Sequence, residues 1–337
     1  MHNPVDGKPR SCRAVIAGTG VNVPKTILTN DELAQRVDTS DEWITTRTGI
    51  KSRHISTAEE TTALLATRAA KMALDNAKIK PKELDLIIVA TVTPEMVFPS
   101  TACFVQDALG AAGAWAFDLA AACSGFVYGL ATAQKFIESG QINKALIIGA
   151  DTLSKITNWE DRASCILFGD GAGAVVLERY DGDDRGILYN TMGSDGSGWK
   201  SLRCQAYGSR HPGPIPLDEP DNVNIWINGR DVYQQAVRMV VESVEKCMTA
   251  CHLTPDDVDM LISHQMNARI IESAAKRLRF PNEKIFVNIA EYGNTSAASI
   301  PIALHECWQA GRVSQGDIVI FVAFGAGMTW GANVMRL

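Results

Sequence analysis

Short continuous apolar runs alternate along the chain with longer segments whose apolar residues recur at helical spacing. Residues 86–89, 145–149 and 318–322 are runs of the first kind, which are typical of strands buried on both faces of a sheet. Residues from about 60 to 77 form a segment of the second kind and predict a helix. Strands that alternate with helices in this way predict an α/β fold in which helices cover parallel sheets.

The pattern occurs twice along the chain. Residues 80–89 pass from a helix end through a proline and an aspartate into an apolar run, and residues 253–262 repeat this order with the same offset. A repeat of this size predicts two similar α/β halves packed together, which we place at residues 12–183 and 184–337. Residues 193–224, near the start of the second half, are rich in Gly, Pro, Ser and Asp and show little periodicity. Irregular segments of that length are usually functional lids or interface segments.

The composition is ordinary for a soluble globular protein, with 46% hydrophobic and 21% charged residues in 337. A net charge of −6 without a long basic run argues against nucleic-acid binding. No window approaches the ~18 continuous apolar residues of a membrane span, and the N-terminus lacks an apolar signal core, so we expect a cytoplasmic protein without a membrane partner. The eight cysteines show no paired spacing and are expected to be reduced. Cys247, Cys251 and His252 cluster on one predicted helix, but no second ligand pair follows, so we expect no metal there.

Cys123 lies where a predicted strand meets a predicted helix. Residues 114–119 suit a buried strand, and apolar residues recur at helical spacing from Phe126 to Phe136. The first N–H groups of a helix are unpaired, and with the positive end of the helix dipole they would lower the pKa of a thiol and hold an oxyanion. A single cysteine among small residues is more often part of a core. The position nevertheless makes Cys123 a candidate nucleophile.

Two polar residues of the second half are its candidate partners. His264 directly follows a buried strand, at the strand end where α/β proteins gather their sites. Asn294 lies in a Gly-Asn-Thr-Ser turn, in the pseudo-equivalent of the Cys123 junction. Each residue alone is more often structural, since a lone histidine is commonly a core group and an asparagine before Thr-Ser commonly caps a helix. The order Cys, His, Asn is nevertheless that of a thiol nucleophile with two hydrogen-bonding partners.

Papain-like cysteine proteases share that order and a similar gap between Cys and His. Their signature around the nucleophile is missing here, and a two-half α/β repeat is foreign to that class. The papain-like reading therefore stays as a remote alternative.

Two glycine-rich segments, residues 168–174 and 324–331, match neither a dinucleotide-binding fingerprint nor a phosphate-binding loop. We expect their glycines to let backbone pass close to the nucleophile, and the backbone N–H near Ala326 to be a second oxyanion donor beside that of Cys123. Trp43 and Arg47 are spaced i, i+4, and on a helix they would share a face able to stack a flat ring and contact a phosphate.

From about residue 14 to residue 337, the chain resembles the β-ketoacyl-acyl carrier protein synthase III family. The stretches that carry the resemblance are residues 38–50, 120–126, 168–174, 264–265, 293–299 and 329–331. The resemblance implies a thiolase-like fold, a layered α-β-α-β-α sandwich, and a homodimer. It also implies an acyltransferase that condenses an acyl-CoA primer such as acetyl-CoA with malonyl-acyl carrier protein, with loss of CO₂, to initiate fatty acid biosynthesis. Cys123, His264 and Asn294 match the family's catalytic triad.

The resemblance also implies roles for residues outside the triad. The matching CoA contacts are Thr39, Trp43, Arg47, Arg162 and Asn267. Those of the acyl pocket are Phe98, Phe168 and Met266, where Phe98 matches a residue that reaches across the dimer. Docking of the acyl carrier protein would use Arg269, Lys276, Arg277 and Arg279. No cofactor beyond the CoA and phosphopantetheine thioesters is implied, and no metal.

Departures from the usual family pattern are local. Met266 and Ala268 stand where Ala and Leu are common, and Ala326 replaces the middle glycine of a Gly-Gly-Gly turn. These positions bear on the size of the substrate. Related acyltransferases and condensing enzymes of secondary metabolism use the same triad and remain a second alternative.

Overall fold

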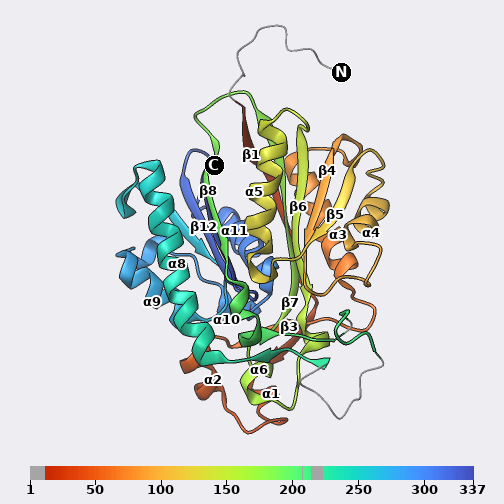
Figure 1. Cartoon of the computed structure of the whole chain (residues 1–337), viewed down its shortest axis with the longest axis vertical. Helices are drawn as coiled ribbons and strands as arrows, with labels where there is room; N and C mark the ends of the chain where they lie inside the picture. The colour runs from red at the N-terminus through yellow and green to blue at the C-terminus, as the bar shows by residue number, and fades with distance from the viewer. Residues whose placement is uncertain (1–11, 207, 214–222) are drawn as a thin grey trace.

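The computed structural model describes residues 12–206, 208–213 and 223–337. Two mixed sheets dominate it (Figure 1). The first has the order β1-β7-β6-β4-β5, with β1 Arg13–Asn22, β7 Asp170–Tyr180, β6 Lys144–Thr152, β4 Leu86–Ala90 and β5 Trp115–Leu119. The second has the order β11-β12-β13-β8, with β11 Met260–Ser263, β12 Ile318–Gly325, β13 Thr329–Arg336 and β8 Gly186–Ser194.

Six longer helices form three layers around the two sheets (Figure 1). The first pair, α3 Thr62–Ala77 and α4 Thr101–Leu109, packs on the outer face of the first sheet. In the centre, α5 Gly125–Glu138 and α11 Ser299–Gln309 share one core with both sheets. The remaining pair, α8 Gly229–Cys251 and α9 Ala268–Leu278, covers the outer face of the second sheet. The predicted α-β-α-β-α layering is therefore confirmed.

The remaining elements are short. The strands are β2 Thr26–Thr29, β3 Ser52–Ile55, β9 Leu202–Arg203 and β10 Trp226–Ile227. The helices are α1 Asn30–Leu33, α2 Asp41–Thr48, α6 Arg162–Cys165 and α10 Ile289–Tyr292. The 3-10 helices are η1 Pro81–Glu83, η2 Ala122–Ser124, η3 Leu153–Ile156, η4 Gly196–Ser201, η5 Pro255–Asp257, η6 Asn282–Lys284 and η7 Ser296–Ala298.

The repeated aspartates make equivalent contacts in the two halves. The Asp85 carboxylate accepts from the backbone N–H of Lys144 at 3.0 Å, and the Asp259 carboxylate accepts from that of Ile318 at 2.8 Å. Each contact fixes the start of the neighbouring parallel strand, β6 or β12. The internal repeat read from the sequence is thus present in three dimensions. We propose 183/184 as the boundary between the halves.

Parallel sheets were predicted, but both large sheets are mixed. Strands β4, β5 and β6 pair in parallel, as do β11 and β12, but β7 and β13 return antiparallel to β6 and β12. The apolar segment at residues 285–288 forms only one bridge, between Leu261 and Ile285. Val287 is exposed there, so that segment has no second buried face to support a full strand. Residues 207 and 214–222 of the predicted irregular segment lie outside the described residues.

Candidate active site

Cys123 lies in η2, between the end of β5 and the first turn of α5. Ala122 before it has φ 47°, a conformation that costs energy for any residue with a side chain and that is common at functional sites. The Ser124 hydroxyl donates to the Thr329 carbonyl at 3.1 Å, and the Thr329 hydroxyl donates to the Ala121 carbonyl at 2.9 Å. The start of β13 therefore holds this turn from the other half of the molecule.

Gly325 lets the second half approach the candidate nucleophile. A Cβ at this position would lie 2.7 Å from the backbone nitrogen of Cys123 and 3.1 Å from that of Ser124. No real side chain tolerates such contacts with backbone. The close backbone approach expected of the glycine-rich segment 324–331 is therefore present.

The second half contains a matching turn, in which η7 precedes α11 as η2 precedes α5. Ser296 has φ 51° and corresponds to Ala122, which puts Ala297 in the position of Cys123. Asn294, which was predicted in the pseudo-equivalent of the Cys123 junction, precedes Ala297 by three residues. Asn294 shares the junction and reaches the site from the segment before the turn.

His264 follows β11 and is buried. Its Nδ1 lies 2.6 Å from the Ser299 hydroxyl oxygen, which also accepts from the backbone N–H of Gln265 at 3.3 Å. A hydroxyl can accept one hydrogen bond and donate another, and a Ser299 hydroxyl that donates to Nδ1 leaves the ring hydrogen on Nε2. Burial lowers the pKa of His264 to about 3, so the ring is neutral at pH 7, and in this tautomer Nε2–H is a hydrogen-bond donor.

Asn294 is fixed through both its backbone and its side chain. Its N–H donates to the Leu167 carbonyl at 2.8 Å, and its carbonyl accepts from the Gly169 N–H at 3.0 Å. Its side-chain oxygen accepts from the Ser296 N–H at 2.9 Å, which is the capping role typical of such a residue. The amide nitrogen is left to face the cavity that Asn294 lines.

Two cavities meet at Cys123. The first, of about 120 Å³, is lined by Cys123, Leu167, Phe168, Leu202, Ile227, Gly229, Val232, Tyr233, His264, Met266, Asn267, Ile270, Asn294, Phe324 and Gly325. The second, of about 210 Å³, is lined by Val92, Ala122, Cys123, Leu153, Ile156, Phe168, Leu202, Arg203, Cys204, Ile225, Ser296 and Ala326. The thiol thus lies between a space that holds both polar partners and a largely apolar space.

The predicted lowering of the Cys123 pKa is wrong for this structure. Burial, with a smaller contribution from the nearby Asp151 carboxylate, raises the pKa of the thiol to about 12, although the Ser296 hydroxyl opposes this rise. The thiol is half-buried and faces narrow cavities, so its charged form loses most of its hydration. The start of α5 does not compensate for that loss.

The predicted CoA contacts form one group around Trp43. The guanidinium carbons of Arg47 and Arg162 lie 4.4 and 4.8 Å from the centre of the Trp43 ring. The Asn267 side-chain amide donates to the Arg47 carbonyl at 3.1 Å and joins α2 to the start of α9. The Thr39 hydroxyl is buried without a hydrogen-bond partner. Asn267 also lines the first cavity, so this group lies on the His264 side of the thiol.

The three residues predicted for the acyl pocket do not all line the same cavity. Phe168 lines both cavities, whereas Met266 lines the first and is absent from the second. Phe98 lines neither and is 81% exposed. Sequence reasoning missed Val92, Leu153, Ile156 and Ile225, which line the second cavity. They come from three segments far apart in the chain, since Leu153 and Ile156 share η3, and no local motif marks them.

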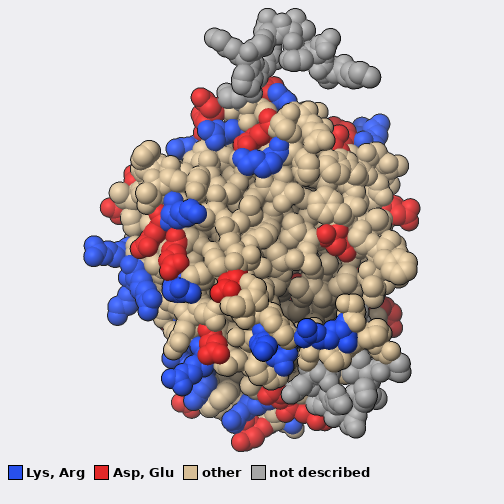
Figure 2. Space-filling view, in the orientation of Figure 1, with Lys and Arg blue, Asp and Glu red and all other residues tan. Residues whose placement is uncertain are grey.

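The predicted docking residues lie at the surface of α9 and just beyond it. Arg269, Lys276 and Arg277 are exposed on the helix, and Arg279 is exposed at its C-cap. Basic side chains gather in the region of α9 at the left of the molecule (Figure 2).

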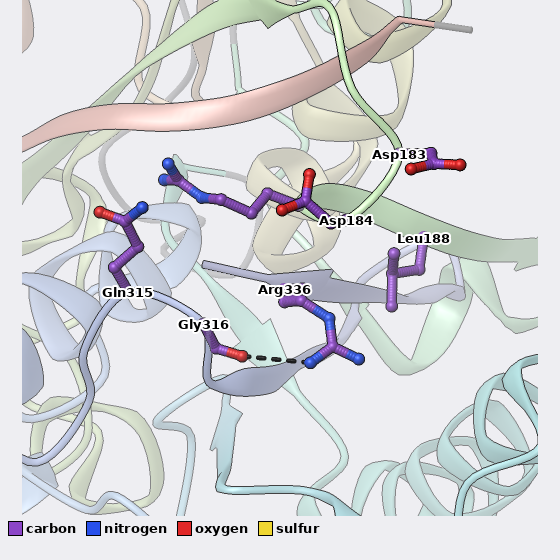
Figure 3. Close-up of a pocket in the computed structure, with 7 residues that line it drawn as sticks. Asp183, Asp184, Leu188, Gln315, Gly316 and Arg336 are labelled. Carbon is purple, nitrogen blue, oxygen red and sulfur yellow. Dashed lines mark hydrogen bonds between the residues drawn. The ribbon is translucent and has the colours of Figure 1, made fainter.

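A larger open groove of about 630 Å³ lies elsewhere (Figure 3). It contains Asp184 and Arg336, near the start of β8 and the end of β13, whereas Cys123 packs near the opposite end of β13. Among the described residues that line it there is neither a cysteine nor a histidine, in contrast to the cavities at Cys123.

In the part of the chain that the structure describes, no helix is long and apolar enough to cross a membrane. Over the same residues, no group of three or more His, Cys, Asp or Glu side chains is arranged to hold a metal ion.

Comparisons with known proteins match nearly the whole chain to one family. The family model described as 3-oxoacyl-[acyl-carrier-protein] synthase III matches residues 117–196, and its C-terminal counterpart matches residues 248–337. The chain is 53% identical to the β-ketoacyl-[acyl-carrier-protein] synthase III of Caldanaerobacter subterraneus, over 96% of this chain and 97% of that protein. It is 50% identical to the enzyme of the same name from Aquifex aeolicus, over 95% and 98%.

Solved structures agree with these matches. The crystal structure of 3-oxoacyl-[acyl-carrier-protein] synthase III from Aquifex aeolicus superposes with a TM-score of 0.90 at 49% identity, covering 96% of this chain and 100% of that chain. The priming β-ketosynthase of the R1128 polyketide pathway superposes with a TM-score of 0.91 at 32% identity, covering 99% of each. The fold is thiolase-like, and the papain-like alternative is excluded.

Proposed function

The chain belongs to the β-ketoacyl-acyl carrier protein synthase III family, and from this premise we propose that it condenses an acyl-CoA primer with malonyl-acyl carrier protein through an acyl-Cys123 intermediate. The overall reaction releases CO₂ and free CoA and yields a β-ketoacyl-acyl carrier protein. An enzyme of this kind is an acyltransferase of fatty acid biosynthesis.

The observation that carries the proposal is the convergence of Cys123, His264 and Asn294 on one cavity. These residues come from η2, from the end of β11 and from the segment before η7, so the fold and not local sequence brings them together. The adjoining apolar cavity gives an acyl chain on the Cys123 sulfur a place to lie. The backbone N–H groups of Cys123 and Ala326 are the proposed oxyanion donors during acyl transfer.

Condensation requires a carbanion, which forms as the malonyl group loses CO₂. The negative charge then develops on the thioester oxygen of the malonyl group, and two donors stabilise it: Nε2–H of His264 and the side-chain N–H of Asn294. The hydrogen bonds of Ser299 to His264 and of Asn294 to Ser296 hold both donors in the required state. The carbanion attacks the acyl-Cys123 carbonyl, and the Cys123 sulfur leaves.

Substrate delivery is proposed on the side of the first cavity. The adenine and phosphates of CoA would contact Trp43, Arg47 and Arg162, with Thr39 and Asn267 beside them. The acyl carrier protein would dock on the basic residues around α9. We further propose a cytoplasmic homodimer, in which the exposed Phe98 reaches the acyl pocket of the partner subunit.

The test is the intact mass of the protein after incubation with a panel of acyl-CoAs, followed by malonyl-acyl carrier protein. We expect one acyl group per chain, its absence in Cys123→Ala, and its release as a β-ketoacyl product. Stoichiometric acylation of Cys123→Ala would place the nucleophile elsewhere and overturn the proposal.

Asn294→Ala separates the two steps. Loss of one oxyanion donor typically costs about 10²–10³ in rate, and we expect malonyl decarboxylation to fall by this factor while acylation of Cys123 falls less. Equal losses in both steps would contradict the assigned role of Asn294.

A further inference from the structure

A buried carboxyl group lies close to Cys123 at the end of β6. Oδ1 of Asp151 accepts from the Thr91 hydroxyl at 2.9 Å, from the Val92 N–H at 2.8 Å, and from the N–H and hydroxyl of Thr93 at 3.1 and 3.0 Å. Its other oxygen, Oδ2, is buried without a hydrogen-bond partner. One oxygen therefore anchors the carboxyl group, and the other has no structural role.

Ser296 belongs to η7, which packs closely against β6: a Cβ on Gly149 of β6 would lie 2.1 Å from the Ala297 carbonyl oxygen. The Ser296 hydroxyl oxygen, like Oδ2 of Asp151, is buried without a hydrogen-bond partner, and this hydroxyl lowers the pKa of both Cys123 and Asp151. Ser296 lines the second cavity together with Cys123. Its backbone has φ 51°, a strained conformation that places the side chain at the junction of the two halves.

Acylation of Cys123 needs a group that takes its proton. His264 is unsuited to this task because burial lowers its pKa to about 3. Burial raises the pKa of Asp151, which brings the basicity of this carboxylate towards that of the thiol. The other titratable side chains among the described residues that line the cavities at Cys123 are Tyr233, Arg203 and Cys204. The Tyr233 hydroxyl is paired with that of Ser273, Arg203 lies over the Trp226 ring, and burial raises the pKa of Cys204, so we assign none of the three as the base.

We propose that the Ser296 hydroxyl relays a proton from the Cys123 thiol to Oδ2 of Asp151, and returns it later in the cycle. As the sulfur attacks the acyl-CoA carbonyl, Ser296 takes the thiol proton and gives its own to Asp151, and CoA leaves as a thiolate that is protonated by solvent. As the malonyl carbanion attacks the acyl-Cys123 carbonyl, the Cys123 thiolate leaves and recovers the proton from Asp151 through Ser296. The cycle consumes one proton overall, which neutralises the CoA thiolate.

This inference rests on the proposed acyl-Cys123 mechanism. The direction in which Asp151→Asn changes the reactivity of the Cys123 thiol distinguishes the relay from a purely electrostatic role of Asp151. A nearby carboxylate raises the pKa of Cys123, so if Asp151 were only a fixed negative charge, Asp151→Asn would make the thiol more reactive at neutral pH. If Asp151 accepts the proton, the same substitution makes the thiol less reactive.

The experiment measures alkylation of Cys123 by iodoacetamide between pH 6 and pH 9, with the labelled site quantified by mass spectrometry, alongside acylation by acyl-CoA. We expect Asp151→Asn and Ser296→Ala each to slow both reactions by about 10²-fold at pH 7 and to move the alkylation profile to higher pH. Because the two groups act in series, the double variant should be no slower than either single variant. Thr91→Val is the matched control, since it removes one hydrogen bond to Oδ1 and leaves Oδ2 and Ser296 in place.

Faster alkylation of Asp151→Asn, or additive losses in the double variant, would overturn the relay. Should Asp151→Asn fail to fold, Ser296→Ala gives the same readout without removing the anchored carboxyl group. If the wild-type chain itself were not acylated at Cys123, the proposed function would fail; normal acylation in the wild type and in both variants would refute the relay alone.

Discussion

Nδ1 of His264 lies 2.6 Å from the hydroxyl oxygen of Ser299, the first residue of α11. This contact joins the end of β11 to the central helix layer, and a Ser299 hydroxyl that donates to Nδ1 holds the ring hydrogen on Nε2. Ser299 lies in the matching stretch 293–299 but was given no role from the sequence, and we propose that it keeps His264 in the form that donates to an oxyanion.

Ser299→Ala tests this control. Loss of the hydrogen bond should cost about 1 kcal/mol of positioning, or roughly five-fold in malonyl decarboxylation, because Nδ1 loses its donor and the ring its orientation. Ser299→Thr retains a hydroxyl and should recover most of the activity. Decarboxylation assays on the two variants check the assignment, and an unchanged rate in Ser299→Ala would refute it.

The pH dependence of stability follows from the buried state of His264. Its folded pKa of about 3 lies below the ordinary value of 6.5, so between these pH values the unfolded chain binds a proton that the folded chain does not. Stability from this group is therefore present above pH 6.5 and is lost as the pH falls towards 3, by up to about 1.4 kcal/mol per pH unit.

We expect urea denaturation at pH 5.0 and 7.5 to show a smaller difference in unfolding free energy for His264→Gln than for the wild type. His305, whose pKa is also lowered by burial, remains in both proteins and supplies the background slope. An identical slope in the two proteins would show that the pKa of His264 is the same in the folded and the unfolded chain.

Much of the fold could be predicted from the sequence because its strongest signals are local. The apolar runs at residues 86–89 and 318–322 became the buried strands β4 and β12, and the repeated aspartates make equivalent contacts before the two parallel strand pairs. The segment 285–288 begins with three apolar residues but forms no strand, because only Ile285 bridges to a neighbouring strand. Pairing partners are a tertiary property that one segment does not encode.

Some features of the candidate site could likewise be predicted from the sequence, and others could not. The order Cys123, His264, Asn294 could be read from the sequence, and so could the proximity of Trp43 and Arg47 on one helix. The raised pKa of Cys123 could not, because it depends on burial beneath residues from several elements. Asp151 likewise gave no signal in the sequence, since its unpaired oxygen is visible only once β6 is packed against η7.

Gly325 provides a steric test of the site. In Gly325→Ala the new Cβ would lie 2.7 Å from the Cys123 nitrogen, so η2 or the end of β12 must move. A displacement of about 1 Å at a reacting group can cost 10²-fold in rate, and we expect acylation of Cys123 to fall by about that factor. Gly196→Ala is the matched control, because a Cβ there meets nothing within 4 Å. Stopped-flow acylation compares them, and equal rates would show that the Cys123 turn adapts to the added side chain.

Docking of the acyl carrier protein on α9 gives the last prediction. The chain has a net charge of −6, so an acidic carrier protein must approach a local basic surface. Lys276 and Arg277 are exposed in the last turn of α9, and the first turn of that helix lies beside the first cavity through Asn267 and Ile270. We expect Lys276→Glu with Arg277→Glu to raise the KM for malonyl-acyl carrier protein and to weaken its dependence on salt, since exposed charges are screened within about 10 Å at 0.1 M salt.

The KM for acyl-CoA should stay nearly unchanged in that variant, because CoA is proposed to contact Trp43, Arg47 and Arg162 instead. Lys71→Glu with Lys82→Glu is the matched control, since it makes the same change in charge at exposed residues of the opposite outer layer, on α3 and η1. Steady-state kinetics with each substrate at 50 and 200 mM salt distinguish the outcomes. Parallel weakening of both substrates, or an equal effect of the control pair, would place the docking surface away from α9, because only a local steering surface acts on one substrate and not the other.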